Sequence, residues 1–254
     1  MRTLLIDGDI IAFQAAAKCE DRIEDFTEEV IVHQKFPVEQ CYKFMDEFLQ
    51  SLLQRLKATQ MIVCLSDQRN FRYDVLPTYK GNRDSSMKPH YLELAKDYLL
   101  ETYDCHILLN AEADDAMGVL ATDPSYLTWG EKIICTTDKD LYQIPVKIYN
   151  WHQDRLSTVT PEEGLMYHMS QVLSGDVADG YGGVTGLGEK KAFIALLEGL
   201  EDGLTLWEAV LREYHRWGMD VEDALCIARV AKICQYEDVD KYTGEIKLWE
   251  PPTA

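Results

Sequence analysis

The chain has 254 residues, 46% of them hydrophobic, and a formal net charge of -19 from 44 acidic and 25 basic side chains. This length permits a sizeable core in one large domain, or in one domain plus a small appendage. The acidic balance argues against a nonspecific nucleic-acid coat, which is normally basic. No apolar run approaches the ~20 residues of a membrane span, so no membrane association is expected.

The seven cysteines are scattered, mostly in apolar surroundings, and form no Cys-x-x-Cys pair. An odd number of scattered cysteines, with no signal sequence before the first predicted strand, favours a reduced intracellular compartment. The six histidines show no paired spacing of the kind that binds zinc. We therefore expect a soluble protein of the cytoplasmic type.

The N-terminal half alternates predicted strands and helices. TLLID predicts a buried strand that stops abruptly at Asp7, and EEVIVHQKF predicts one arm of a small hairpin. Apolar spacing predicts a helix over 37–57, followed by a buried strand at MIVCL (61–65). A polar, basic stretch over 67–89 precedes a helix over 91–103, a strand at HILLN and a helix that begins at EADD.

The next segments complete the expected sheet. KIICTT and VKIYNW predict strands on either side of a short helical turn over 140–144. This alternation is typical of an α/β fold with a mainly parallel central sheet flanked by helices. After residue 160 the pattern is helical, with glycine-rich punctuation at 180–188 and no further strong strand until EIKLWE. We expect an α/β domain over 1–160 and a helical subdomain over 161–254.

Carboxylates recur at the ends of these apolar runs, where an open α/β sheet places its ligand crevice. Two carboxylates about 5 Å apart repel by roughly 3 kcal/mol at an effective dielectric of about 20, so their convergence requires cations. Each motif alone also fits a turn or a helix N-terminus, but their joint occurrence favours a metal site. The predicted metal ligands are Asp7, Asp67, Glu112, Asp114, Asp115, Asp138, Asp140, Asp176 and Asp179.

The ligand type predicts the metal. Oxygen ligands without His or Cys favour Mg²⁺, with Mn²⁺ able to take its place. Two such ions a few ångströms apart can activate a water and stabilise the leaving oxygen of a phosphodiester. The sequence therefore predicts divalent-metal phosphodiesterase chemistry.

A basic segment, LPTYKGNR, adds candidate phosphate ligands. Lys80 and Arg83 are three residues apart, so on a helical turn both charges could reach one phosphate. The alternative is a solvated basic turn. Tyr79 could stack on a terminal base or simply pack inside the turn.

The glycine-rich segment GYGGVTGLGEKKA is similar to a phosphate-binding loop, but Glu189 occupies the position at which a P-loop needs Lys. What remains is a glycine hairpin that leads into a helix. Backbone N–H groups and a helix N-terminus can hold a DNA phosphate without reading sequence. The candidate DNA contacts are Gly186, Gly188, Lys190 and Lys191, and the hairpin carbonyls could bind K⁺.

Together these segments closely resemble the 5′-nuclease superfamily, which includes flap endonucleases, the 5′-nuclease domain of bacterial DNA polymerase I and phage 5′–3′ exonucleases. The resemblance covers residues 4–192, through LLIDGD, LSD…YKGNR, EADD, TTDKDLYQI and GDVADGYGGVTGLGEKKA in the family order. With no polymerase domain attached, the chain is most similar to a stand-alone phage-type exonuclease. That similarity implies a cytoplasmic location in a bacterial or phage-infected cell.

The resemblance implies a PIN-like 5′-nuclease fold, with a helical arch near 68–103 and a DNA-binding helix-two-turn-helix element near 175–200. It assigns the acids up to Asp115 to a first metal ion and the four later aspartates to a second. Lys80 and Arg83 would contact the scissile phosphate, and Lys190 and Lys191 the duplex. Two residues depart from the family pattern. Asp9 stands where Asn, Ser or Thr is usual, and Gly180 replaces an Asn.

The expected function is Mg²⁺-dependent hydrolysis of DNA from 5′ ends, nicks or flaps, with RNA–DNA hybrids as further candidate substrates. A replication polymerase or a single-strand-binding protein is a candidate partner. One alternative is a PIN-like ribonuclease, which leaves the glycine hairpin and YKGNR without a purpose. The other is a non-catalytic, structure-specific DNA-binding module whose acids hold only a structural ion.

Overall fold

A six-stranded sheet in the order β5-β4-β1-β6-β7-β8 forms the centre of the protein. The computed structural model describes residues 2–24, 30–126 and 130–252. β1 pairs in parallel with β4 and β6, and only β8 runs antiparallel to its neighbour. The predicted mainly parallel sheet is confirmed. Its strands are β1 (Arg2–Asp7), β4 (Gln60–Leu65), β5 (Cys105–Ile107), β6 (Glu131–Thr136), β7 (Lys147–Asn150) and β8 (Arg155–Thr158).

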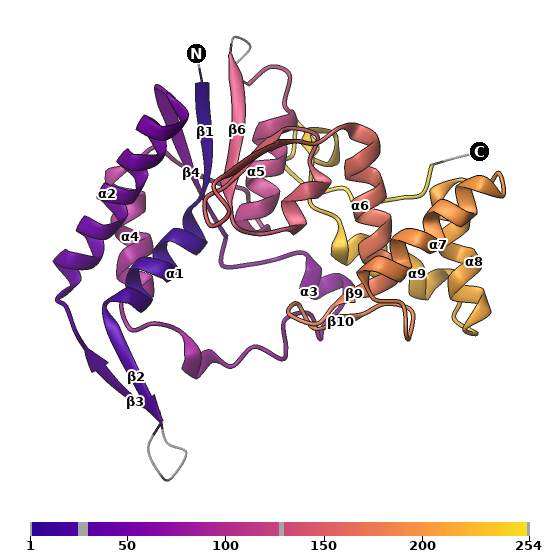
Figure 1. The fold of residues 1–254 in the computed structure, drawn as a ribbon, viewed down its shortest axis with the longest axis horizontal. Helices are drawn as coiled ribbons and strands as arrows, with labels where there is room; N and C mark the ends of the chain where they lie inside the picture. Colours follow the sequence, from indigo (N-terminus) through magenta and orange to yellow (C-terminus); the bar gives the residue numbers. More distant parts are fainter. Residues whose placement is uncertain (1, 25–29, 127–129, 253–254) are drawn as a thin grey trace.

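Helices cover both faces of this sheet (Figure 1). Because side chains alternate along a strand, Leu4 and Ile6 of β1 face one side and Leu5 the other. The first side packs against α1 (Gly8–Lys18), α2 (Val38–Leu56) and α4 (Leu92–Thr102), and the second against α5 (Ala113–Thr122). Both faces of β1 are therefore buried, which explains its continuous apolar sequence.

Helix α1 begins immediately after β1, where the sequence indicated only an abrupt strand end. Asp7 is its N-cap and accepts a hydrogen bond from the Ile10 N–H at 3.1 Å. Gly8 permits the sharp turn, because a Cβ there would lie 2.6 Å from Cγ1 of Val63. The cap thus holds the Asp7 carboxylate at the carboxyl end of β1.

The residues after 160 form a helical bundle, seen at the right of Figure 1. Its core surrounds Tyr214, which is fully buried and donates to the Val172 carbonyl. A two-stranded hairpin of β9 (Gly175–Asp176) and β10 (Tyr181–Gly182) separates the first two helices. The helices are α6 (Pro161–Ser174), α7 (Glu189–Glu201), α8 (Leu206–Arg216) and α9 (Val221–Ala231).

Residues 66–91 run from the sheet past the helical bundle and back to α4 (Figure 1). This stretch contains only the short α3 (Arg72–Val75) and a 3₁₀ turn, η1 (Ser85–Met87), so the part of the predicted helical arch before α4 consists mostly of turns. The antiparallel hairpin of β2 (Glu20–Glu24) and β3 (Val30–Gln34) approaches it and confirms the hairpin predicted there.

The predicted strands differ from the structure in two places. β8 was not predicted, and it extends the sheet beyond β7. The predicted strand at EIKLWE is wrong: after the 3₁₀ turn η3 (Tyr236–Asp238), this segment forms only an isolated bridge between Val239 and Ile246. Within the described ranges, no helix is long and apolar enough to cross a membrane.

Candidate active site

The carboxyl ends of β1 and β6 bring the first acids together. The Asp7 carboxylate accepts from the Thr136 hydroxyl at 2.7 Å, which joins the ends of the two strands. Asp138 follows β6, and its carboxylate accepts the Asp140 N–H at 2.8 Å. Since parallel strands end at the same edge of a sheet, residues 129 positions apart in the chain meet there.

Helix α5 points its N-terminus at this edge. Glu112 is the N-cap and Asp114 lies in the first turn. Burial raises the pKa of Asp114 well above its usual value, and the neighbouring charges of Asp138 and Asp7 raise it further. These acids therefore lie close enough to oppose one another's ionisation.

Two other carboxyls show the same crowding. Burial raises the pKa of Asp7 to about 7 despite the hydrogen bonds from Thr136 and Ile10, and Asp9 and Asp138 add to the shift. Burial also raises the pKa of Asp140 to about 7, with a contribution from Asp138. A bound cation would lower both pKa values, because it stabilises the ionised forms of the two carboxyls.

The β9–β10 hairpin supplies the last two acids. Asp176 accepts the Ala178 N–H at 2.7 Å and fixes the turn that carries Asp179. Gly180 adopts φ +73°, and a Cβ there would lie 2.9 Å from the side-chain oxygen of Asn82. The positive φ and this close approach both favour glycine, the residue by which the chain departs from the family pattern.

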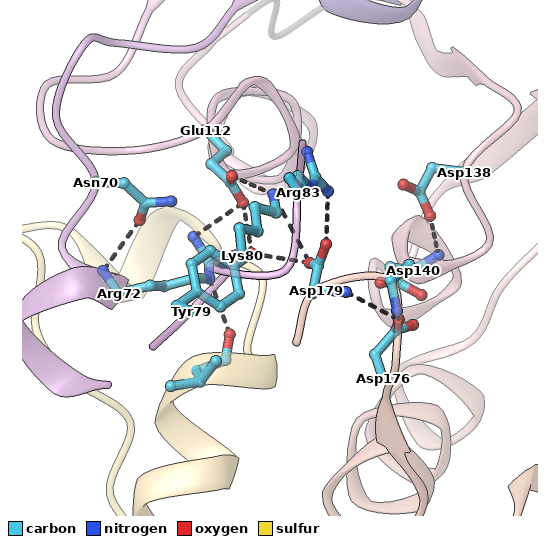
Figure 2. Close-up of polar contacts among 12 residues, drawn as sticks. Asn70, Arg72, Tyr79, Lys80, Arg83, Glu112, Asp138, Asp140, Asp176 and Asp179 are labelled. Carbon is cyan, nitrogen blue, oxygen red and sulfur yellow. Dashed lines mark hydrogen bonds and ion pairs between the residues drawn. The ribbon is translucent and has the colours of Figure 1, made fainter. Parts of the chain in front are cut away.

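Lys80 and Arg83 lie among these acids (Figure 2). Lys80 forms an ion pair with Glu112, and its Nζ is 3.7 Å from Asp179. Arg83 contacts Asp179 at 2.6 Å. Lys80 has φ +52°, and its N–H donates to the Asp179 carbonyl at 2.7 Å, so the backbone holds this turn against the hairpin.

Two predicted ligands have other partners. The Asp67 carboxylate accepts N–H groups of Gln68 and Asn110, at 2.8 and 2.7 Å. Asp115 is fully buried and forms a bidentate pair with Arg72, at 2.6 and 2.9 Å. Both carboxylates thus have hydrogen-bond or ion-pair partners in this structure, and their role as metal ligands stays a prediction.

The expectation that Tyr79 offers a face to a base needs correction. Its side chain is only 2% exposed. The ring stacks on Tyr181 with centroids 6.4 Å apart and forms an edge-to-face pair with Tyr73 at 5.9 Å. Packing therefore covers the ring, and only its hydroxyl reaches the acids.

The predicted DNA-contact residues lie at the start of α7. Gly188 is the N-cap, Gly186 has φ +82°, and a Cβ on either glycine would meet no atom within 4 Å. Lys191 donates to the Gly186 carbonyl at 3.2 Å. Lys190 and Lys139 both line a groove of about 1110 Å³ between β8, α6 and α7.

Several residues that support the site were not predicted. Asp9, for which the sequence indicated no role, has an oxygen 2.8 Å from Nζ of Lys96 on α4 and accepts the Ser66 N–H at 3.3 Å. Gln171 of α6 donates to Asp140 at 2.7 Å. A lysine or glutamine within an amphipathic helix gives no sequence signal for such a role.

The donor set fits a hard divalent cation, because carboxylate oxygens dominate it and several are costly to ionise. Within the described residues, no three acidic, histidine or cysteine side chains are already arranged to hold a metal ion. Lys80, Arg83 and Lys139 lie among the acids and pair with them.

Comparison with known proteins identifies the family of this chain. Residues 2–170 match the family model described as 5′-3′ exonuclease, N-terminal resolvase-like domain. The exonuclease of Escherichia phage T7 is 28% identical over 98% of this chain and 93% of its own length. A DNA polymerase I of Lactococcus lactis subsp. cremoris is also 28% identical, but the match spans 78% of this chain and only 24% of the polymerase.

Solved structures show the same fold. The 5′-exonuclease of T5 with bound zinc has a TM-score of 0.64 at 18% identity, covering 91% of this chain and 93% of the other. The bacteriophage T5 flap endonuclease in complex with DNA and metal ions has a TM-score of 0.65 at 17% identity, with the same coverage. Because the family model spans most of the chain, from β1 into α6, this protein belongs to the 5′–3′ exonuclease family and is a phage-type nuclease of the 5′-nuclease superfamily.

Proposed function

We propose that this nuclease hydrolyses DNA from 5′ ends, nicks or flaps, and that it uses Mg²⁺ in a two-metal mechanism. The observation that carries the proposal is the meeting of Asp7, Asp114 and Asp138 at one edge of the sheet, with Lys80 beside them. Acids that raise one another's pKa are costly to the fold, so this arrangement is best explained by a cation that neutralises them.

The acids would divide between two ions. Asp7, Glu112 and Asp114 would hold one ion, and the later aspartates, Asp138, Asp140, Asp176 and Asp179, would hold or orient the other. Bound divalent ions supply an activated water and neutralise the leaving oxygen of the phosphodiester. Asp115 would act indirectly, because it accepts the Glu112 N–H at 3.0 Å and thereby fixes the first turn of α5.

Lys80 and Arg83 would bind the scissile phosphate. Both already contact carboxylates, and Arg83 has a side chain 57% exposed, so it can turn toward an incoming phosphate. Arg offers a bidentate fork to phosphate oxygens, while Lys acts as a point charge.

The duplex would lie against the start of α7. Gly186 and Gly188 leave open space for a close backbone approach, and Lys190 and Lys191 add positive charge. Helix N-termini bind phosphate without reading sequence. A complex of the T5 flap endonuclease with DNA and metal ions supports this class of substrate. Potassium at the hairpin, RNA–DNA hybrids, polymerase or single-strand-binding partners and a cytoplasmic location remain predictions.

The decisive experiment compares 5′-labelled and 3′-labelled duplex, nicked and flap DNA in Mg²⁺ and in EDTA. The double variant Asp138→Ala with Asp140→Ala should lower turnover on the order of 10³-fold or more, because transition-state charge stabilisation is lost. Binding of flap DNA to this variant should remain measurable. The matched control removes two exposed acids of α2, Glu39→Ala with Glu47→Ala, and should leave turnover unchanged.

The same assay separates the alternatives. Preferential cleavage of a matched RNA flap would support the PIN-like ribonuclease. Fork binding in Mg²⁺ without any product after long incubation would support the non-catalytic module. Undiminished turnover of the double aspartate variant would contradict the two-metal assignment.

A further inference from the structure

The hydroxyl of Tyr79 lies between two candidate metal ligands from different parts of the fold (Figure 2). It is 2.9 Å from a carboxylate oxygen of Glu112, at the start of α5. It is also 2.8 Å from a carboxylate oxygen of Asp179, in the β9–β10 hairpin. One side chain therefore contacts an acid of the sheet domain and an acid of the helical bundle.

Packing fixes this hydroxyl in place. The ring of Tyr79 is buried between Tyr181 and Tyr73, and its own backbone N–H donates to the Leu76 carbonyl at 2.9 Å. The next residue is tied to the hairpin, since the Lys80 N–H donates to the Asp179 carbonyl. The phenol consequently has little freedom to leave the two carboxylates.

The hydroxyl is a neutral donor. Burial raises the pKa of Tyr79 well above its usual value, and Glu112 and Asp179 raise it further, so the phenol keeps its proton. A phenol has one proton to donate, which the two carboxylate oxygens share. Unlike the ammonium of Lys80, this donor orients both acids without adding positive charge that would oppose a cation.

The two kinds of contact have different consequences during the reaction. If Lys80 turns to a phosphate, it gives up its ion pair with Glu112. Tyr79 cannot turn with it, because its ring is held in the core of the helical bundle. The phenol would then be the remaining side-chain link between Glu112 and Asp179. A hydrogen-bond partner that orients a ligand commonly changes metal affinity by about 10–100-fold.

We propose that Tyr79 is a positioning residue that holds Glu112 and Asp179 at the spacing needed for metal binding, and so couples the ligands of the sheet domain to those of the helical bundle. This proposal rests on the proposed metal-dependent function. It replaces base stacking, one of the two roles that the sequence left open for Tyr79.

The test measures metal binding in the full-length protein without DNA. Calorimetric titration with Mn²⁺ should show roughly tenfold weaker binding for Tyr79→Phe than for the unaltered protein. Phe keeps the buried ring, so the circular dichroism spectrum should not change. Tyr73→Phe is the matched control: Tyr73 packs on the same ring but is 47% exposed, and its Mn²⁺ affinity should equal that of the unaltered protein.

Two further measurements separate positioning from general loosening of the fold. Tyr79→Phe should raise the Mg²⁺ concentration for half-maximal cleavage about tenfold, while turnover at saturating Mg²⁺ falls less than about threefold. In a double-mutant cycle, Tyr79→Phe should weaken Mn²⁺ binding less when Asp179→Asn is already present.

The outcomes are distinct. Equal Mn²⁺ affinity for Tyr79→Phe and the unaltered protein would overturn the positioning role, as would an additive cycle. A loss of turnover that saturating Mg²⁺ does not restore would overturn it too. If the unaltered protein itself binds no Mn²⁺, the proposed metal-dependent function fails instead.

Discussion

Arg72 and Asp115 form an ion pair that is almost completely shielded from water. The guanidinium also donates to the carbonyls of Val230 and Lys232, at 2.8 and 2.7 Å, and Asp115 accepts the Cys234 N–H at 2.9 Å. Burial alone would raise the pKa of Asp115, but the Arg72 charge and the hydrogen bonds from Arg72, Cys234 and Glu112 together outweigh it and hold that pKa below its usual value. The pair therefore joins α3 and α5 to the chain that follows α9.

We predict that Asp115→Asn destabilises the protein by about 3–5 kcal/mol, because it leaves the buried Arg72 charge without a counter-ion. Denaturant unfolding in EDTA measures this change directly. The control is Asp202→Asn, which removes the exposed partner of Arg212 and should cost less than about 1 kcal/mol. Unchanged stability combined with lost metal binding would instead make Asp115 a ligand, as the sequence indicated.

The site shows what sequence could and could not predict about single residues. Asp7 and Asp138 were predictable because each follows a buried strand, and strand ends converge at one edge. Asp115 was not distinguishable from Asp114, since adjacent residues of a helix point in directions about 100° apart and only the fold decides which one meets Arg72. For Tyr79 the sequence could not decide between base stacking and packing, because its covering partner Tyr181 lies about a hundred residues away in the chain.

At the scale of elements, the β2–β3 hairpin holds the segment that leads into α4. Arg22 of β2 donates to the carbonyls of Ser86 and Lys88, at 3.2 and 2.6 Å. Glu20 accepts the His90 N–H at 2.9 Å and also pairs with Arg22 at 2.8 Å. The hairpin therefore anchors the far end of the stretch that carries Lys80 and Arg83.

We predict that Arg22→Ala loosens residues 84–91 without unfolding the sheet. Hydrogen bonds from a charged donor contribute about 1.5–3 kcal/mol, enough for tenfold or faster amide exchange in that segment. Hydrogen-exchange mass spectrometry should detect this change, with exchange in β1 unaltered. Arg155→Ala, on the exposed β8, is the control and should leave residues 84–91 as they are. Equal protection of this segment in both variants would contradict the anchoring role.

Among the elements, those with strong periodicity were predicted and those defined by tertiary contacts were not. The apolar spacing of α2 and the apolar run of β4 gave both elements to within a few residues. α1 was missed, because its start is marked only by Asp7 as N-cap and by the close approach of Gly8 to β4. EIKLWE alternates like a strand but finds no sheet edge to join, so its pattern was misleading.

For the whole molecule, the crowded acids make stability depend on pH. The folded pKa of Asp7 and of Asp140 is about 7, above the ordinary value of 3.8. Each group therefore stabilises the fold while it holds its proton, and this contribution is lost as pH rises through about 7. Burial lowers the pKa of His106 and His168, so their effect on stability has the opposite sign. It levels off within about one pH unit above the ordinary histidine value, so it offsets only part of the loss from the two aspartates. The interval from pH 6.5 to 8 therefore reports mainly on the acids.

In EDTA, we expect the melting temperature to fall between pH 6.5 and 8, because ionising each of the two aspartates costs on the order of 1 kcal/mol over this interval. A protein of this size loses about 2–4 °C for each kcal/mol. Saturating Mg²⁺ should prevent most of this decrease in melting temperature, because a cation stabilises the ionised carboxylates. The melting temperature in Mg²⁺ should therefore exceed that in EDTA by an amount that increases with pH. Asp140→Asn removes one titrating group and should flatten the EDTA curve, whereas the exposed Glu47→Ala should not. If the difference in melting temperature between Mg²⁺ and EDTA stays constant from pH 6.5 to 8, these acids do not form the cation site.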